Sequence, residues 1–322
     1  MAKALNEALR ASMEADAKVL VMGEDVGRLG GVFRVTDGLM KDFGEARVMD
    51  TPLAESGIVG TAIGLAMRGY RPVCEIQFDG FVYPAYNQIV SQLAKIHART
   101  KGAVRMPITI RIPFGGGIGA VEHHSESPEA YFAHTAGLKV LACSNPQDAF
   151  VMLQQAIRAA DPVIFFEPKR RYWEKAEVDV SAALASASPL WRARVVRSGI
   201  DATLIAYGPM VSTCLAAAVA AEGEGRSLEV VDLRTLSPLD FPTVVESVRR
   251  TRRAIVVHEA PSFLGLGAEI AARLSEELYY EMEAPVLRVT GFDIPYPPSR
   301  LEEDYLPDLD RVLHAVDRSL GF

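Results

Sequence analysis

The segment from residue 50 to residue 64 reads DTPLAESGIVGTAIG and joins a turn to a run of small residues. Asp50 and Thr51 are residue types that cap helices, and Pro52 suits a first helical position, so we expect a helix to begin here. Three of the eight residues from 57 to 64 are glycine. Because each interior glycine costs a helix about 1 kcal/mol relative to alanine, this helix is expected where another backbone or a flat ligand comes very close.

Glu55 stands at the start of this helix among mostly apolar side chains. A carboxylate at the edge of a dry site must be paired, or it must hold a proton. The residues alone leave two interpretations open. Glu55 is either a site residue or a first-turn acid that complements the helix dipole.

The composition is that of an ordinary globular protein. The chain has 322 residues, of which 49% are hydrophobic and 23% charged, and this length permits two domains. A net charge of −7 argues against a nucleic-acid partner. No apolar run approaches the roughly 18 residues of a membrane span, and the charged N-terminal residues do not suit a signal peptide. Cys74, Cys143 and Cys214 lie in apolar stretches without CxxC spacing, so we expect reduced core cysteines and a cytoplasmic protein.

Strands and helices alternate along two parts of the chain. Residues 1–180 show this alternation, which predicts a parallel, doubly wound sheet. Residues 181–198 are small, poorly periodic and weakly charged, so we expect a linker. A second alternating pattern fills residues 199–322. The predicted fold is therefore two doubly wound α/β domains.

A glycine-rich stretch, GGGIG at 115–119, leads into His123 and His124. The spacing does not match a dinucleotide-binding fingerprint, which argues against an NAD-binding oxidoreductase, and we expect a flexible loop bordering a site. In an extended loop the two histidines would point in opposite directions, and the further ligands of a metal site are missing. A solvated loop and an acid–base or oxyanion-stabilising imidazole both stay open.

Aromatic residues crowd the loop after the strand expected at 72–77. Core packing is the ordinary role of such residues, but this loop lies where α/β proteins place their sites, so an aromatic ring here could stack on a flat ligand. The residues concerned are Phe78, Phe81, Tyr83 and Tyr86.

Taken together, these motifs form an ordered series that covers nearly the whole chain. It resembles the β subunit of the thiamine-diphosphate-dependent 2-oxo acid dehydrogenases, the decarboxylating first component of those complexes. The resemblance implies a transketolase-like pyrimidine-binding domain and a transketolase C-terminal-like domain. The motifs are GEDV at 23–26, GGVFRVTDGL at 30–39, DTPLAESGIVG at 50–60, RPVCEIQFDGF at 71–81, HHSESPEAYFAH at 123–134, FFEPKR at 165–170, VVDLRTLSPLD at 230–240 and TGFDIPYP at 290–297.

The resemblance also implies roles for four residues. Glu55 takes the place of the family's glutamate that hydrogen-bonds the aminopyrimidine ring of the cofactor. Phe81 takes the place of the aromatic residue against that ring. His124 matches the histidine implicated in acyl transfer to lipoyl groups or in stabilising the decarboxylated intermediate. Glu24 matches an acidic position in a buried channel between two active sites, although a loop-capping role is equally open.

The resemblance further implies that this chain is half of an enzyme. The family's GDG…N motif for the Mg²⁺ of thiamine diphosphate is missing here and belongs to an α subunit. We therefore expect an α2β2 heterotetramer that serves a lipoyl-bearing acyltransferase core. Some relatives bind a structural potassium ion near the turn that corresponds to residues 158–161, where Ala159 replaces a carboxylate, so this ion is left open.

Three stretches resemble the branched-chain members of the family, and this resemblance implies branched-chain 2-oxo acids, such as 3-methyl-2-oxobutanoate, as the substrates. The stretches are EIQFDGF at 75–81, EHHSES at 122–127 and SPEAYFAH at 127–134. The alternative is a pyruvate dehydrogenase β subunit. An alternative of another class is a non-catalytic assembly subunit. The joint presence of Glu55, Phe81 and His124 argues against a chain reduced to assembly.

Overall fold

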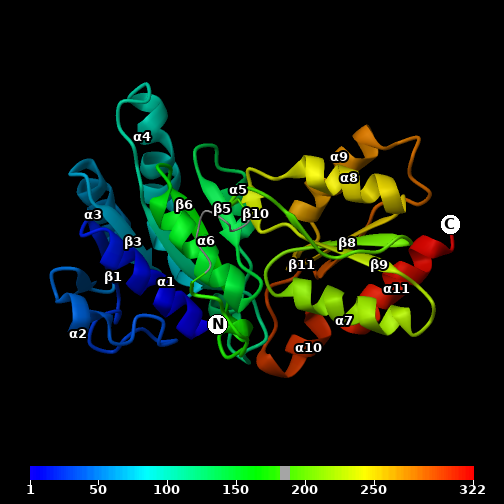
Figure 1. Ribbon diagram of the computed structural model, residues 1–322, viewed down its shortest axis with the longest axis horizontal. Coiled ribbons are helices and arrows are strands. Elements are labelled where there is room, and N and C mark those ends of the chain that lie inside the picture. The colour runs from blue at the N-terminus through cyan, green and yellow to red at the C-terminus, as the bar shows by residue number, and fades with distance from the viewer. Residues whose placement is uncertain (182–188) are drawn as a thin grey trace.

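The computed structural model describes residues 1–181 and 189–322, which fold into two α/β lobes around two separate sheets (Figure 1). The strands are short, and most of them are buried; β7 and parts of β2 and β12 are more accessible. Parallel sheets need cover on both faces, and near-continuous apolar strands such as VIFFEP are the sequence form of that requirement.

The sheet of the first lobe has the order β10-β5-β6-β4-β3-β1-β2. All neighbours are parallel except β10, which runs antiparallel to β5. β10 comes from the second half of the chain and adds an edge strand to the sheet of the first half. The strands are β1 (Val19–Gly23), β2 (Val48–Asp50), β3 (Arg71–Glu75), β4 (Thr109–Phe114), β5 (Lys139–Ala142), β6 (Val163–Pro168) and β10 (Thr235–Ser237).

Alternate side chains of this sheet enter two different cores, as the pleat of a strand requires. Val163 and Phe165 of β6 pack with α1 (Ala2–Ala15), α2 (Leu39–Phe43) and α6 (Pro146–Arg158) on one face. Ile164 and Phe166 belong to the core on the other face. That face is covered by α3 (Glu55–Met67), the π-helical turn η2 (Gln88–Leu93), α4 (Ala94–Arg99) and α5 (Glu129–Ala133).

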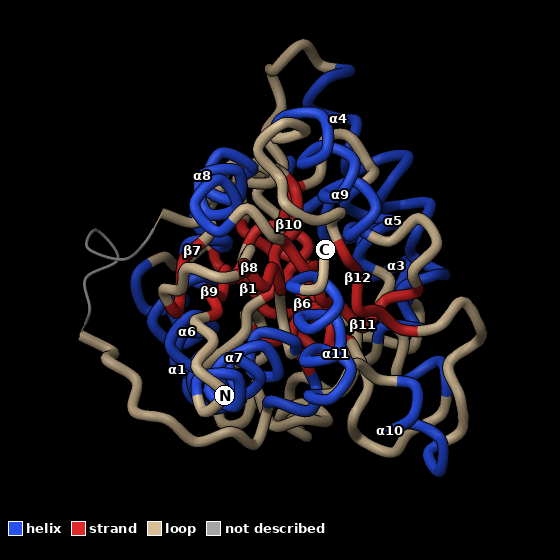
Figure 2. Tube along the Cα trace, turned by 90° about the vertical axis from the view of Figure 1, so that its right-hand side faces the viewer, coloured by secondary structure: helices blue, strands red, loops and turns tan. Residues whose placement is uncertain are grey.

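The sheet of the second lobe has the order β12-β11-β8-β9-β7 and is parallel except for β7. Figure 2 shows it between α8 and α9 on one side and α7 and α11 on the other. Its strands are β7 (Arg194–Arg197), β8 (Ala202–Ala206), β9 (Leu228–Asp232), β11 (Ala254–Pro261) and β12 (Leu287–Gly291), and its helices are α7 (Met210–Glu222), α8 (Phe241–Thr251), α9 (Leu266–Glu277), α10 (Glu302–Tyr305) and α11 (Leu309–Leu320).

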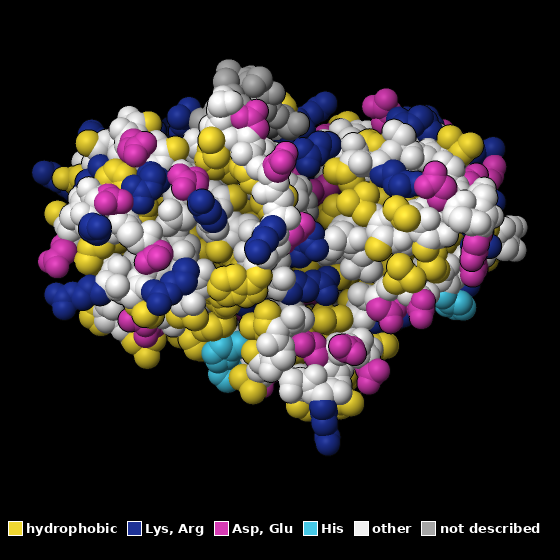
Figure 3. All heavy atoms as spheres, turned by 60° about the horizontal axis from the view of Figure 1, so that its bottom comes forward, with side chains coloured by type: hydrophobic (Ala, Val, Ile, Leu, Met, Phe, Trp, Pro, Cys, Tyr) yellow, Lys and Arg dark blue, Asp and Glu magenta, His cyan; other side chains and the backbone are white. Residues whose placement is uncertain are grey.

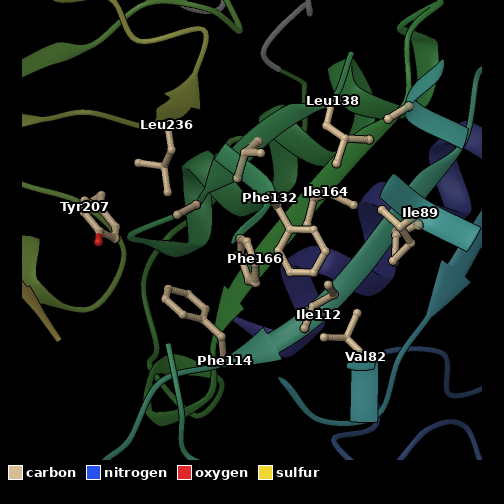
Figure 4. Close-up of a cluster of buried hydrophobic side chains, with 14 of the residues drawn as sticks. Val82, Ile89, Ile112, Phe114, Phe132, Leu138, Ile164, Phe166, Tyr207 and Leu236 are labelled. Atoms are coloured by element: carbon tan, nitrogen blue, oxygen red, sulfur yellow. The ribbon is translucent and has the colours of Figure 1, made fainter. Parts of the chain in front are cut away.

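One hydrophobic core runs through both lobes. Phe114, Phe132 and Phe166 of the first lobe share it with Tyr207 and Leu236 of the second half of the chain (Figure 4). The lobes therefore meet through packed side chains as well as through β10.

The expected fold of two α/β domains with mainly parallel sheets is confirmed, with local differences besides the unexpected edge strand β10. The helix expected at Asp50 begins at Glu55, because the Asp50 carboxylate accepts hydrogen bonds from the Gly27 and Arg28 amides, at 2.5 and 3.2 Å, instead of capping the helix. Strand β7 lies inside the expected linker 181–198, of which residues 182–188 lie outside the described residues. The exact boundaries of the two domains stay a prediction.

The three cysteines are buried and unpaired, as expected. Within residues 1–181 and 189–322, no helix is long and apolar enough to cross a membrane.

Candidate active site

The four predicted site residues follow the carboxyl ends of four neighbouring strands. Glu24 comes directly after β1, Glu55 opens the helix after β2, and Phe81 lies in the 3₁₀ segment η1 (Asp79–Ala85) after β3. His124 follows β4 in the 3₁₀ turn η3 (Glu122–His124). These strands are adjacent in the order β4-β3-β1-β2, and this edge of a parallel sheet is where α/β proteins bind ligands.

The segments that carry Glu55, Phe81 and His124 also pack against one another in turn. Helix α3 packs against η1, and η1 packs against η3. Each of these three consecutive packed elements carries one predicted residue: Glu55, Phe81 or His124. The fold thus brings together segments that are 26 and 43 residues apart in sequence, from 55 to 81 and from 81 to 124.

Glu55 is the first residue of α3 and is half-buried in this chain. The neighbouring Glu24 has its pKa raised, first by burial and then by the negative charges of Asp25 and Glu55. Like charges close together disfavour the ionised form, which here raises the pKa of Glu24. Glu24 therefore belongs to the electrostatic surroundings of Glu55.

The glycines of α3 lie on its outer face. A Cβ atom added at Gly64 would meet nothing within 4 Å, and one at Gly57 or Gly60 would meet a single side-chain atom, at 3.7 or 3.9 Å. Their backbone is helical, so conformation does not call for glycine. Within the described part of the chain, no neighbour explains these residues, whose small size leaves room for a second molecule along α3.

His124 sits in an aromatic cluster. Its ring centroid lies 4.2 Å from that of Phe78 and 5.1 Å from that of Phe81, both edge to face. The His123 ring is only 4.4 Å from the His124 ring, so the expectation that the two side chains point in opposite directions is wrong. The reason is that residues 122–124 form a 3₁₀ turn instead of an extended strand. Figure 3 shows histidine side chains at the surface beside hydrophobic ones.

The surroundings of His124 disfavour the charged form of its imidazole. Burial lowers its pKa most, and the positive charges of His123 and Lys169 lower the pKa further. Its Nδ1 atom is buried without a hydrogen-bond partner among the described residues. A neutral ring with one free nitrogen can accept or donate a proton toward a bound molecule.

A buried ion pair that we did not predict from the sequence anchors the histidine loop. The Lys169 ammonium contacts Asp79 Oδ1, and both side chains are almost fully buried. The other oxygen, Asp79 Oδ2, accepts a hydrogen bond from the Glu126 amide at 2.8 Å. The available signal was a lysine directly after the apolar strand VIFFEP, because an ammonium in such a place needs a partner.

The turn considered for a potassium ion already has a cation beside it. Arg71 Nη1 donates to the carbonyl oxygens of Ile157 and Ala159, at 3.1 Å each. Among the described residues, no group of three or more His, Cys, Asp or Glu side chains could hold a metal ion.

Comparison with known proteins identifies the relatives of this chain. Two family descriptions match it: "Transketolase, pyrimidine binding domain" over residues 1–174 and "Transketolase, C-terminal domain" over residues 192–312. The pyruvate dehydrogenase E1 component subunit beta of Leifsonia xyli subsp. xyli is 61% identical over 322 residues, which is 100% of this chain and 95% of the relative. The chain belongs to the E1 β subunits of the 2-oxo acid dehydrogenases.

Both substrate types occur among similar family members. The 3-methyl-2-oxobutanoate dehydrogenase subunit beta of Mycobacterium tuberculosis is 56% identical over 321 residues, covering 99% of this chain and 91% of the relative. A solved structure described as a split gene transketolase, an inactive β4 tetramer, matches with a TM-score of 0.80 and 24% identity, over 99% of this chain and 97% of that one. This last likeness concerns the fold alone.

Proposed function

We propose that this E1 β subunit is the catalytic β half of a 2-oxo acid dehydrogenase that uses thiamine diphosphate. The observation that carries the proposal is the placement of Glu55, Phe81 and His124 on consecutive elements at one sheet edge, next to the open glycine face of α3. A chain kept for assembly alone would not need this constellation.

The residues at this edge fit the pyrimidine half of the cofactor. A flat aminopyrimidine ring offers nitrogen atoms to a carboxyl group and a face to an aromatic ring. Glu55 would hydrogen-bond a ring nitrogen, and Phe81 would lie against the ring. When bound, thiamine diphosphate supplies the carbanion chemistry of decarboxylation, while the protein orients it and moves protons.

The proton chemistry belongs to three side chains. Glu55 would hold or release a proton at the ring nitrogen, and its charge is one of the causes that raise the pKa of Glu24 beside it. His124, whose pKa is lowered and whose Nδ1 atom has no partner among the described residues, would donate or accept a proton during acyl transfer to a lipoyl group.

We infer the partners from the family motifs of the chain and from the open glycine face of α3. An α subunit would bring the Mg²⁺ site and would approach the outer face of α3 in an α2β2 heterotetramer. A lipoyl-bearing acyltransferase core would take the acyl group. We place this assembly in the cytoplasm. The potassium ion is left open, and the carbonyl oxygens of residues 157 and 159 accept hydrogen bonds from Arg71.

The substrate is proposed as one of two types. The motifs at 75–81 and 122–134 favour branched-chain 2-oxo acids, whereas the 61% identical relative carries the pyruvate name and slightly favours pyruvate. Turnover of pyruvate and of 3-methyl-2-oxobutanoate by the reconstituted α2β2 enzyme decides between them.

The test of the function is Glu55→Gln in that reconstituted enzyme. We expect decarboxylation with an artificial electron acceptor to fall by at least about 100-fold, because the amide cannot exchange a proton with the ring. Glu45→Gln, which changes an exposed carboxylate in the same lobe, is the matched control. Size-exclusion chromatography should show an intact heterotetramer for both variants. Substantial turnover by Glu55→Gln would count against a catalytic role and would favour an assembly subunit.

A further inference from the structure

The glycine-rich loop at 115–119 is held by carboxylates of the other lobe. The Gly117 amide donates to Glu302 Oε1 and the Gly119 amide to Glu302 Oε2, both at 2.9 Å. The Gly116 amide donates to Glu259 Oε2 at 3.0 Å. This loop, which we expected to be flexible, therefore bridges the two lobes. Gly117 and Glu302 are 185 residues apart in sequence.

The loop backbone is shaped for this contact. Gly115, Gly117 and Gly119 have φ values of +81°, +85° and +71°, so the loop alternates between left-handed and ordinary conformations. Such alternation turns successive amides toward one side, where they bind an anion. A Cβ atom at Gly116 would lie 1.9 Å from the Tyr296 hydroxyl oxygen, so a side chain would push the lobes apart.

Glu302 is fixed on its own side of the contact. It is the first residue of α10, is 7% exposed, and accepts a further hydrogen bond from the Tyr296 hydroxyl at 2.7 Å. Both of its oxygens are thus occupied by donors. A carboxylate in this state is a rigid bidentate clamp on the loop.

The clamped loop leads directly to His124. The Gly115 amide donates to the Glu126 carbonyl at 2.9 Å and closes the loop at its base, where the Glu126 amide is tied to Asp79. The base is therefore anchored in the first lobe and the glycine tip in the second. His124 lies between these anchor points, against Phe78 and Phe81.

We infer that Glu302 is a positioning residue, which holds the loop at 115–126 so that the His124 imidazole stays in the aromatic cluster. The inference rests on the proposed role of His124 in acyl transfer. Loss of the clamp would disturb the step that uses His124 more than the decarboxylation that uses Glu55, since His124 stands in the loop itself and Glu55 stands on α3, which packs against β3, η1 and η2.

The test is Glu302→Gln in the reconstituted α2β2 enzyme. The glutamine side chain keeps the shape of glutamate, but an NH2 group replaces one acceptor oxygen. This NH2 group and a loop amide are both donors, so they cannot form the hydrogen bond that the oxygen accepts. We expect acylation of a lipoyl domain to fall about 10-fold, and decarboxylation with an artificial acceptor to stay within about 2-fold. Hydrogen exchange of the peptide at 115–126 should speed up about 10-fold. Glu303→Gln, an exposed neighbour, should change none of these.

A second variant tests the same contact from the loop side, so that a folding defect in Glu302→Gln alone does not decide the result. Gly119→Ala forces an L side chain into a left-handed conformation at the clamp, yet its Cβ would meet only Ser299 Cβ, at 3.9 Å. It should reproduce the selective loss of lipoyl acylation and the faster loop exchange.

The outcomes separate this inference from the proposed function. Equal losses of both rates, or unchanged loop exchange, in Glu302→Gln and Gly119→Ala would overturn the clamp. His124→Ala is measured in parallel. If His124→Ala acylates lipoyl domains normally, the proposed role of His124 fails, while the exchange measurement still decides whether Glu302 holds the loop.

Discussion

Glu129 is the residue whose surroundings are most unusual for a carboxyl group. It is fully buried where α5 meets the second lobe, and the Tyr207 hydroxyl donates to its Oε1 atom. Its Oε2 atom has no partner among the described residues. Burial raises its pKa from 4.5 to about 7, because water no longer stabilises the charge.

This shift predicts a pH-dependent stability. The folded pKa lies above the unfolded one, so the contribution of Glu129 is fully present below pH 4.5 and is lost as the pH rises toward 7. The span of about 2.5 pH units corresponds to roughly 3 kcal/mol. Glu129→Gln cannot ionise, so its stability relative to the native chain should increase between pH 5 and pH 8. Urea unfolding at the two pH values measures this difference, with Glu303→Gln as the exposed control. An equal difference at both pH values would show that Glu129 is already charged at pH 5.

Some residues of the site could be predicted from the sequence, and others could not. Glu55, Phe81, His124 and Glu24 stand in motifs, and the structure places all four at one sheet edge. Their roles stay predictions. Asp79, Lys169 and Glu302 went unrecognised because their partners are far away in sequence: 90 residues separate Lys169 from Asp79. A short stretch of sequence can indicate that Lys169 needs a partner, but it does not show which residue the partner is.

At the scale of elements, α3 was predictable in existence but not in its start. Its composition indicated a helix that something approaches closely, and its glycine face is open in this chain. The predicted start relied on Asp50 as the helix cap, but the Asp50 carboxylate accepts hydrogen bonds from two amides of the loop after β1. β7 and β10 escaped prediction because each is short and pairs antiparallel at an edge, so only tertiary contacts define it.

The open glycine face predicts opposite effects on folding and on assembly. Gly64→Ala should stabilise the isolated chain by about 0.5–1 kcal/mol, since alanine is the better helix former and, outside the backbone of α3, its methyl group would meet no atom of the described residues within 4 Å. The same methyl group should obstruct an α subunit that packs closely on α3, and we expect association to weaken about 10-fold or more. Urea unfolding of the β chain and titration with the α subunit measure the two effects.

Val219→Ala is the matched control for this variant. Val219 is 60% exposed on α7, far along the chain from α3, and alanine should also raise helix stability there. We expect its association with the α subunit to equal that of the native chain. Native-like association of Gly64→Ala would mean that the partner does not meet this face of α3.

At the scale of the whole molecule, the lobes are joined by three kinds of contact. β10 extends the first sheet, the glycine loop is held by Glu259 and Glu302, and one hydrophobic core spans both lobes (Figure 4). A core that crosses a domain boundary makes each lobe depend on the other for burial of its apolar side chains. The separate folding of the two lobes, which their separate sheets suggest, is therefore disfavoured.

Leu236→Ala tests this dependence. Leu236 lies in β10, is 3% exposed, and packs in the shared core. Truncation should cost about 2–5 kcal/mol through lost burial and the cavity left behind. Because the lobes share that core, peptides from β4 and from β11 should lose hydrogen-exchange protection at the same, lowered urea concentration. Retained protection of β4 at a concentration where β11 has already lost it would mean that the lobes unfold independently, and the shared core would then be too weak to make them one cooperative unit.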